Sequence, residues 1–191
     1  DIDSEKKLEL QLSERASYDF LSQLYNRSTF ERELKSEIER SAHAKVAVLF
    51  IDVDDFKFIN DRFGHSVGDE VIKYVAGCIK QRVKGSGFAG RFGGDEFVLC
   101  ITDPKQIEEI ESLSLDLIDE LYEGYHSELA NVSINVKASI GIAFYPEHGD
   151  DSNKVVAAAD EAMYFVKKNG KANYHIYQPE DSEMEDLQHT L

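Results

Sequence analysis

Residues 45–53 read Lys-Val-Ala-Val-Leu-Phe-Ile-Asp-Val, a run that is apolar apart from its first residue and Asp52. An unbroken apolar run of this length, rich in β-branched residues, is typical of a central strand that is buried on both faces of a sheet. An ionised carboxylate at the end of such a strand costs free energy unless a positive charge compensates it. Asp52 therefore indicates a cation-binding position at this end of the sheet, and a divalent cation would supply the charge.

Helix and strand patterns flank this run on both sides. Ser28, with Glu31 three residues later, predicts a capped helix. The adjacent glycines Gly93 and Gly94 predict a hairpin, because glycine adopts the positive φ angles of tight turns. In full, the patterns predict helices at 28–42, 55–63, 68–83, 105–125 and 153–168, and further strands at 88–92, 96–101, 132–144 and 174–177. This order predicts an α/β fold with a mixed central β-sheet flanked by helices.

The two ends of the chain differ from this central part. Residues 4–16 carry Leu8 and Leu12 among charged residues at helical spacing, which predicts an amphipathic N-terminal extension helix. This helix either packs on its own domain or forms the end of a coiled coil that descends from an upstream domain. The segment after residue 178 is acidic, and we expect it to be loosely held. We therefore predict a signalling or linker helix at 1–16, one domain at 17–178 and an acidic C-terminal tail at 179–191.

Composition and charge exclude several classes of protein. The 191 residues contain 21 Lys and Arg against 37 Asp and Glu, a formal net charge of −16. Because nucleic-acid affinity depends largely on basic side chains that neutralise phosphates, we expect no nucleic-acid partner. No apolar run approaches the roughly 20 residues of a transmembrane helix, and the N-terminus lacks the pattern of a secretion signal. We expect a soluble, cytoplasmic segment without membrane contact; whether an upstream segment anchors the full-length protein in the inner membrane stays open.

A second acidic pair follows the two glycines. Asp95 and Glu96 come directly after Gly94 on the predicted hairpin. If this hairpin pairs with the strand at 45–53, Asp52 and Asp95 converge and offer the oxygen ligands that Mg²⁺ prefers. Mg²⁺ held by few carboxylates keeps coordination positions that substrate phosphates usually fill. The residues thus indicate an acidic protein that binds a phosphorylated ligand through a metal ion.

Residues 91–97, Arg-Phe-Gly-Gly-Asp-Glu-Phe, resemble the motif that names the GGDEF domain family, the diguanylate cyclases. The segments 19–27, 52–69, 138–143 and 160–173 resemble the other sequence blocks of this family, so the likeness spans about residues 17–178. The resemblance implies a fold related to the palm of nucleotidyl cyclases and polymerases. It also implies an activity in bacterial second-messenger signalling: two molecules of GTP are condensed to cyclic di-GMP with release of pyrophosphate. A homodimer with one GTP per domain, controlled by an upstream sensory domain, is implied as well.

The resemblance further implies roles for individual residues. Asp52 and Asp95 would bind the metal ion, Mg²⁺ or alternatively Mn²⁺, with help from the Val53 carbonyl. Asp95 and Glu96 would act in catalysis, and the resemblance does not separate their roles. The implied GTP-binding set comprises Asn60 and Asp69 for the guanine, Lys57, Lys167 and Lys171 for the triphosphate, Gly93 and Gly94 for room, and His65.

The chain departs from the family pattern at one regulatory position. Many members carry Arg-x-x-Asp nine residues before the first motif glycine, where the product binds and inhibits, but here Lys84 to Gly87 reads Lys-Gly-Ser-Gly. We therefore expect weak product inhibition or none at this position, since lysine cannot replace the planar grip of arginine. Two other interpretations stay open: a catalytically silent module that binds GTP and regulates a neighbouring domain, and a purely structural dimerisation module.

Overall fold

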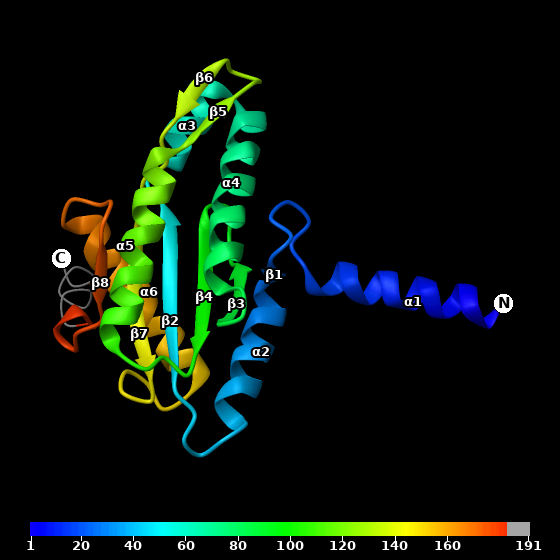
Figure 1. Ribbon diagram of the computed structural model, residues 1–191, viewed down its shortest axis with the longest axis vertical. Helices are drawn as coiled ribbons and strands as arrows, with labels where there is room; N and C mark the ends of the chain where they lie inside the picture. Colours follow the sequence, from blue (N-terminus) through cyan, green and yellow to red (C-terminus); the bar gives the residue numbers. More distant parts are fainter. Residues whose placement is uncertain (183–191) are drawn as a thin grey trace, which may run out of the picture.

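The core of the protein is a mixed β-sheet. The computed structural model describes residues 1–182, apart from the side chains of residues 14 and 15. Within these residues a six-stranded sheet has the order β1-β3-β4-β2-β7-β8, in which β2 runs antiparallel to both of its neighbours. The strands are β1 (Tyr25–Asn26), β3 (Gly87–Arg91), β4 (Glu96–Thr102), β2 (Val46–Val53), β7 (Ala138–Tyr145) and β8 (Tyr174–Ile176). Figure 1 shows β2 in the middle of the sheet, as the apolar run at 45–53 predicts.

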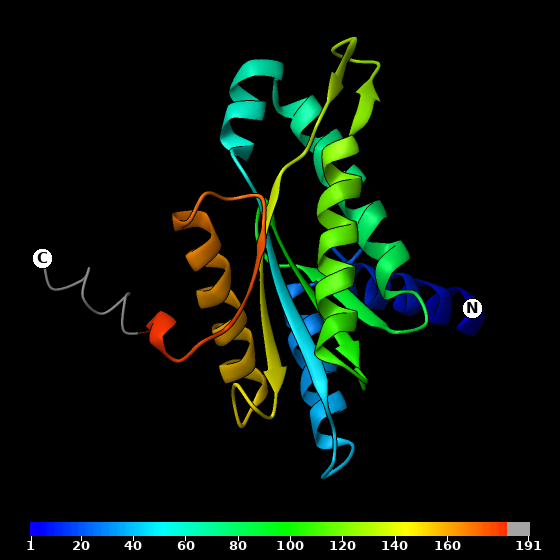
Figure 2. The ribbon, with the colours of Figure 1, turned by 60° about the vertical axis from the view of Figure 1, so that its left-hand side comes forward.

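Helices cover both faces of this sheet, which confirms the predicted fold class. The first face packs against α2 (Arg27–Glu39) and α6 (Ser152–Lys168), and the second against α4 (His65–Val83) and α5 (Ile107–Glu123). The short helix α3 (Phe56–Phe63) leads from the end of β2 into α4 (Figure 2). Side chains alternate along β2: Val48 and Phe50 pack toward α2 and α6, whereas Leu49 and Ile51 pack toward α4 and α5. Asp52 continues the first of these two rows.

The predicted strand at 132–144 is two strands. Its first part, β6 (Val132–Ile134), pairs with β5 (Tyr125–Ser127) in a separate two-stranded hairpin, and only β7 joins the main sheet. The interruption lies where Val136 donates its backbone N–H to Leu121 O at 3.0 Å and Lys137 O accepts from Asp54 N at 2.8 Å. The sequence near these residues does not reveal such long-range backbone hydrogen bonds. The alternating pattern therefore predicted one continuous strand where the structure has two.

Two local predictions about turns and caps are wrong in detail. The N-cap of α2 is Asn26, whose side chain accepts the backbone N–H of Thr29 at 3.0 Å, so Ser28 lies inside the helix. Gly93 and Gly94 have no positive φ angle. Instead the guanidinium of Arg91 binds both of their carbonyl oxygens, which holds the hairpin without left-handed backbone.

The N-terminal helix α1 (Ile2–Ser17) projects away from the domain (Figure 1). Leu8, Leu10 and Leu12 are 57%, 62% and 55% exposed, so the interpretation that this helix packs on its own domain is wrong. The coiled-coil alternative stays a prediction. Within residues 1–182, the structure contains no helix with the length and apolar character that crossing a bilayer requires.

The start of the acidic tail is held more firmly than we expected. Asp181 is 8% exposed, its carboxylate lies 3.1 Å from His175 Nε2, and it accepts the backbone N–H of Gln178 at 2.9 Å. The rest of the predicted tail, residues 183–191, lies outside the described residues.

Candidate active site

The end of β2 brings the two acidic segments together. Asp52 lies opposite Glu96 of β4 on one side and opposite Ser139 of β7 on the other. Since directly opposed residues of antiparallel strands point to the same face, all three side chains face α2 and α6. The backbone N–H of Val53 donates to Asp95 O at 3.1 Å, which fixes the hairpin beside the end of β2. The predicted convergence of the two segments is therefore present in the fold.

The electrostatics of this site favour a cation. Burial and the neighbouring charge of Asp95 raise the pKa of Asp52 to about 7, although the charge of Lys167 acts in the opposite direction. In residues 1–182 no three His, Cys, Asp or Glu side chains gather in a metal-binding group. The metal ligands that the resemblance implies are the carboxylates of Asp52 and Asp95 and the Val53 carbonyl. Such a sparse oxygen set fits Mg²⁺, which usually retains water and substrate phosphates as further ligands.

Lys167 of α6, on the face of the sheet to which Asp52 points, contacts the carboxylates of Asp52 and Asp54. Its Nζ lies 3.1 Å from Asp52 Oδ1 and 2.7 Å from Asp54 Oδ1. Burial by itself lowers the pKa of Lys167, but the hydrogen bond to Asp54 and the charges of both aspartates outweigh burial and raise it. Lys167 is thus held protonated beside the position predicted for the metal and the phosphates. Asp54 received no role from the sequence, although its spacing from Asp52 places both carboxylates at the same strand end.

The other predicted GTP-binding residues lie on α3, α4 and the loop after α6. Lys57 is exposed on α3, and His65 and Asp69 are exposed on the first turns of α4. Lys171, in the loop after α6, has its Nζ 2.8 Å from Asp55 Oδ1. These elements surround the end of β2 at which Asp52 lies (Figures 1 and 2).

Asn60 is tightly packed at the junction of α3 and α4. A Cβ atom on Gly68 would come 1.8 Å from Asn60 Oδ1, so the amide lies directly over the backbone of α4. Any side chain at position 68 would displace it. Gly68 therefore leaves the space that this amide occupies, and the resemblance assigns the amide to guanine; the sequence alone did not show this packing.

The two motif glycines leave space on the hairpin. A Cβ on Gly93 would lie 3.2 Å from Glu96 Oε2, and a Cβ on Gly94 would meet no atom within 4 Å. The hairpin thus presents an open backbone beside the carboxylates, as the predicted approach of a ligand requires.

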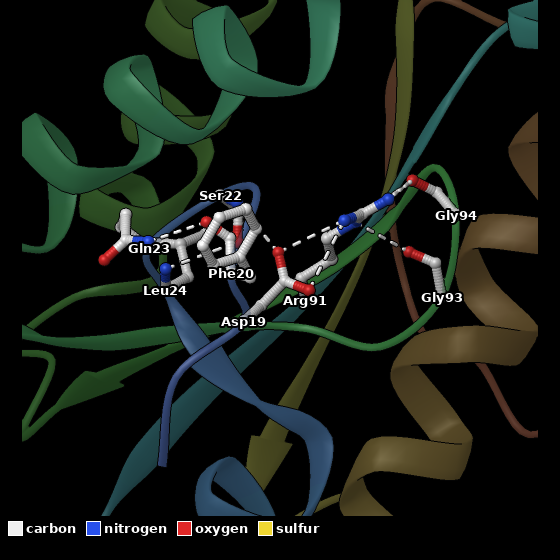
Figure 3. Close-up of polar contacts among 8 residues, drawn as sticks. All are labelled: Asp19, Phe20, Ser22, Gln23, Leu24, Arg91, Gly93 and Gly94. Carbon is white, nitrogen blue, oxygen red and sulfur yellow. Dashed lines mark hydrogen bonds and ion pairs between the residues drawn. The ribbon is translucent and has the colours of Figure 1, made fainter. Parts of the chain in front are cut away.

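An ion pair that the sequence did not predict, between Arg91 and Asp19, contacts the backbone of the glycine hairpin. Figure 3 shows Arg91 between Asp19 and the two glycines. Its Nη1 lies 3.1 Å from Asp19 Oδ2, its Nε donates to Gly93 O at 3.1 Å, and its Nη2 donates to Gly94 O at 2.8 Å. Asp19 also accepts the backbone N–H of Ser22 at 2.8 Å. Both residues lie within the quoted family segments, but nothing in the sequence pairs them.

Gly87 occupies the position at which the resemblance implies an aspartate in many family members. A Cβ on Gly87, at the start of β3, would come 1.8 Å from Cys100 O of the neighbouring strand. The backbones are too close for any larger residue without a shift of the sheet edge. The close packing of β3 on β4 therefore favours glycine at position 87.

Comparisons with known proteins show the family to which this sequence belongs. The sequence model described as "Diguanylate cyclase, GGDEF domain" matches residues 16–173. The chain is 34% identical to the diguanylate cyclase TpbB of Pseudomonas aeruginosa over 89% of its own length and 39% of that protein. It is 30% identical to the cyclic di-GMP phosphodiesterase PdeR of Escherichia coli over 94% of its length and 27% of that protein. It spans less than half of either relative.

The fold of this chain also matches a solved GGDEF structure. The coiled coil and GGDEF domain of DgcB from Caulobacter crescentus, a complex with c-di-GMP, superimposes with a TM-score of 0.86 at 25% identity, and the match covers 92% of this chain and 93% of that one. The sequence match over most of the chain, the shared fold and the converging acidic segments lead to one conclusion. The chain belongs to the GGDEF domain family of diguanylate cyclases, which acts in cyclic di-GMP signalling.

Proposed function

We propose that this domain is an active diguanylate cyclase. The 3′-hydroxyl oxygen of one GTP attacks the α-phosphorus of a second GTP, the bond from that phosphorus to the bridging oxygen breaks, and pyrophosphate leaves. The reciprocal attack closes the ring, so two GTP give one cyclic di-GMP and two pyrophosphates. The observation that carries this proposal is the meeting of Asp52 and Asp95 beside an open glycine backbone.

Asp52, Asp95 and the Val53 carbonyl would hold the divalent cation that diguanylate cyclases of this family generally use. When bound, Mg²⁺ or Mn²⁺ lowers the pKa of the attacking hydroxyl and offsets charge on the leaving phosphates. Asp95 or Glu96 would accept the hydroxyl proton. Lys57, Lys167 and Lys171 would bind the triphosphate as positive charges.

Base selection would come from the α3–α4 corner. A carboxylate can accept from N1–H and N2–H of guanine while an amide donates to an acceptor on the base, whereas adenine has no N–H at N1 and no amino group at C2, so the carboxylate would lose these partners. Asn60 and Asp69 supply these groups, with His65 beside them on α4. GTP should therefore be strongly preferred to ATP.

Two domains would have to meet for turnover. One domain offers one such site, while the product contains two nucleotides, so the domains of a homodimer would face each other with one GTP each. The exposed leucines of α1 support this arrangement, because an upstream sensory domain could pair the helices of two chains.

A catalytically silent module is the alternative. The similarity to PdeR shows that a phosphodiesterase also contains a segment of this kind. All of the proposed metal and nucleotide residues are present in this chain, which favours the active enzyme.

Chromatography of the products after incubation with GTP and Mg²⁺ tests the proposal. We expect cyclic di-GMP and pyrophosphate from GTP, and little product from ATP. Asp95→Asn keeps the shape of the side chain and removes its charge, so it should lower turnover by about two orders of magnitude or more. Binding of GTP without any product would favour the silent module.

A further inference from the structure

Asp54 is a buried carboxylate to which neither the sequence nor the proposed mechanism gives a role. It follows Val53 at the end of β2, and only 1% of its side chain is exposed. A buried ionised carboxylate is costly unless its oxygens are paired. Here three groups pair with it, from β7, from α6 and from the loop after α6. Asp54 therefore ties three segments together beside the proposed metal site.

Its first oxygen holds Lys167. Asp54 Oδ1 accepts hydrogen bonds from Lys167 Nζ and from Ser139 Oγ, each at 2.7 Å. Lysine has a long flexible side chain, and fixing it in advance lowers the entropy lost on ligand binding. Lys167 Nζ also lies 3.1 Å from Oδ1 of Asp52, which the proposed function assigns to the metal. When Asp52 binds the cation, the hydrogen bond from Lys167 to Asp54 still holds the lysine in place.

Its second oxygen holds the loop that carries Lys171. Asp54 Oδ2 accepts the backbone N–H of Ala172 at 2.9 Å. Lys171 and Ala172 have φ angles of 61° and 48°, a left-handed conformation that is unfavourable for residues with a Cβ atom. A loop of this shape persists only when surrounding contacts hold it, and the bond to Asp54 is one of them.

We propose that Asp54 is a positioning residue for the substrate triphosphate: it fixes Lys167 directly and Lys171 through the loop backbone, and it touches neither substrate nor metal. The inference rests on the proposed function, which assigns both lysines to the phosphates. Asp55 provides a matched control. It is the next carboxylate in the chain and it pairs with Lys171 itself, but its side chain is 60% exposed, so water screens this contact and it contributes little.

The experiment compares two nucleotides that cannot react. 3′-DeoxyGTP and 3′-deoxyGMP lack the attacking hydroxyl, so calorimetry with Mg²⁺ reports binding without turnover. Asp54→Asn should weaken 3′-deoxyGTP about tenfold or more, because charge-assisted bonds that position the lysines are lost. It should change 3′-deoxyGMP by no more than about twofold, because the guanine contacts on α3 and α4 are unaffected. Asp55→Asn should change either affinity by less than about threefold.

A double-variant comparison shows whether Asp54 acts through the lysine. Lys167→Met should weaken 3′-deoxyGTP on its own, and adding Asp54→Asn should cost much less than it does in the wild-type background. If the affinity losses of the two single variants multiply in the double variant, the substitutions act independently and the proposal is overturned. An equal loss of affinity for 3′-deoxyGTP and 3′-deoxyGMP in Asp54→Asn would overturn it as well. If Asp54→Asn does not fold by circular dichroism, Ser139→Ala removes one partner of the carboxylate and must show the same selective loss for the triphosphate. Wild-type protein that binds neither nucleotide would contradict the proposed function itself.

Discussion

Nη1 of Arg91 lies 3.1 Å from Oδ2 of Asp19, a residue 72 positions earlier in the chain. The pair joins the segment that leads out of α1 to the hairpin that carries the acidic residues (Figure 3). Both side chains are largely buried, at 17% and 25% exposure. Arg91 also binds the carbonyls of Gly93 and Gly94, so its side chain links the N-terminal segment to the hairpin by direct polar contacts.

Replacing this arginine should affect activity more than stability. Arg91→Lys keeps the charge but cannot bind an aspartate and two carbonyls together, and we expect turnover to fall about tenfold or more as the hairpin loses its position. Arg82→Lys is the control, because Arg82 forms an ion pair of similar burial with Glu120, between α4 and α5. Both variants should lose about 1 kcal/mol in urea unfolding. Equal turnover in the two variants would contradict the positioning role.

Asp52 should destabilise the metal-free domain at neutral pH. Its pKa is about 7 in the folded protein and about 3.9 in an unfolded chain. As pH rises from about 4 to 7, the unfolded chain releases this proton first, so stability falls over that window and stays lower above it. In EDTA, Asp52→Asn should therefore be equally stable at pH 4 and more stable than wild type at pH 8 by about 2 kcal/mol, half of the about 4 kcal/mol of the full shift because solvent reaches part of this carboxylate. Thermal unfolding at both pH values checks this; a less stable variant at pH 8 would refute it.

A methyl group at Gly68 should disturb base recognition. Gly68→Ala would push the Asn60 amide out of position, since the added Cβ would lie 1.8 Å from its oxygen. We expect the KM for GTP to rise about tenfold and the preference over ATP to narrow. Gly77→Ala, elsewhere on α4, meets open space. It should leave kinetics unchanged and stabilise the helix by about 0.5–1 kcal/mol.

Product should bind weakly at residues 84–87. Lys84 lacks the planar grip of arginine, and Gly87 has no room for an aspartate. Calorimetric titration with cyclic di-GMP should show no sub-micromolar binding there, and turnover should continue as product accumulates. Tight binding that Lys84→Ala abolishes would show that this position still holds product.

Activity should depend on the meeting of two domains. Turnover per domain should fall on dilution, because a transient pair obeys mass action. Initial rates measured over a hundredfold range of protein concentration check this. Strict proportionality of rate to concentration at the lowest concentrations would indicate that the isolated chain does not work by transient pairing.

Local pattern was enough for much of this protein. The apolar run of β2 required a buried central strand, and an acidic residue at its end required a compensating charge. The glycine pair followed by two carboxylates then indicated where the second half of the site lies. Each inference needed only residues adjacent in sequence, because strand periodicity and the cost of a buried charge are local properties.

Contacts between distant residues were decided by the tertiary structure. No pattern near Asp54 reveals that Ser139, Lys167 and Ala172 surround it, and no pattern near Arg91 identifies Asp19. The same holds for the glycine hairpin, which Arg91 supports in place of left-handed backbone, and for the separation of β6 from β7. Hydrogen bonds and ion pairs form wherever packing brings donors and acceptors together, and that placement exists only once the sheet and its helices have assembled.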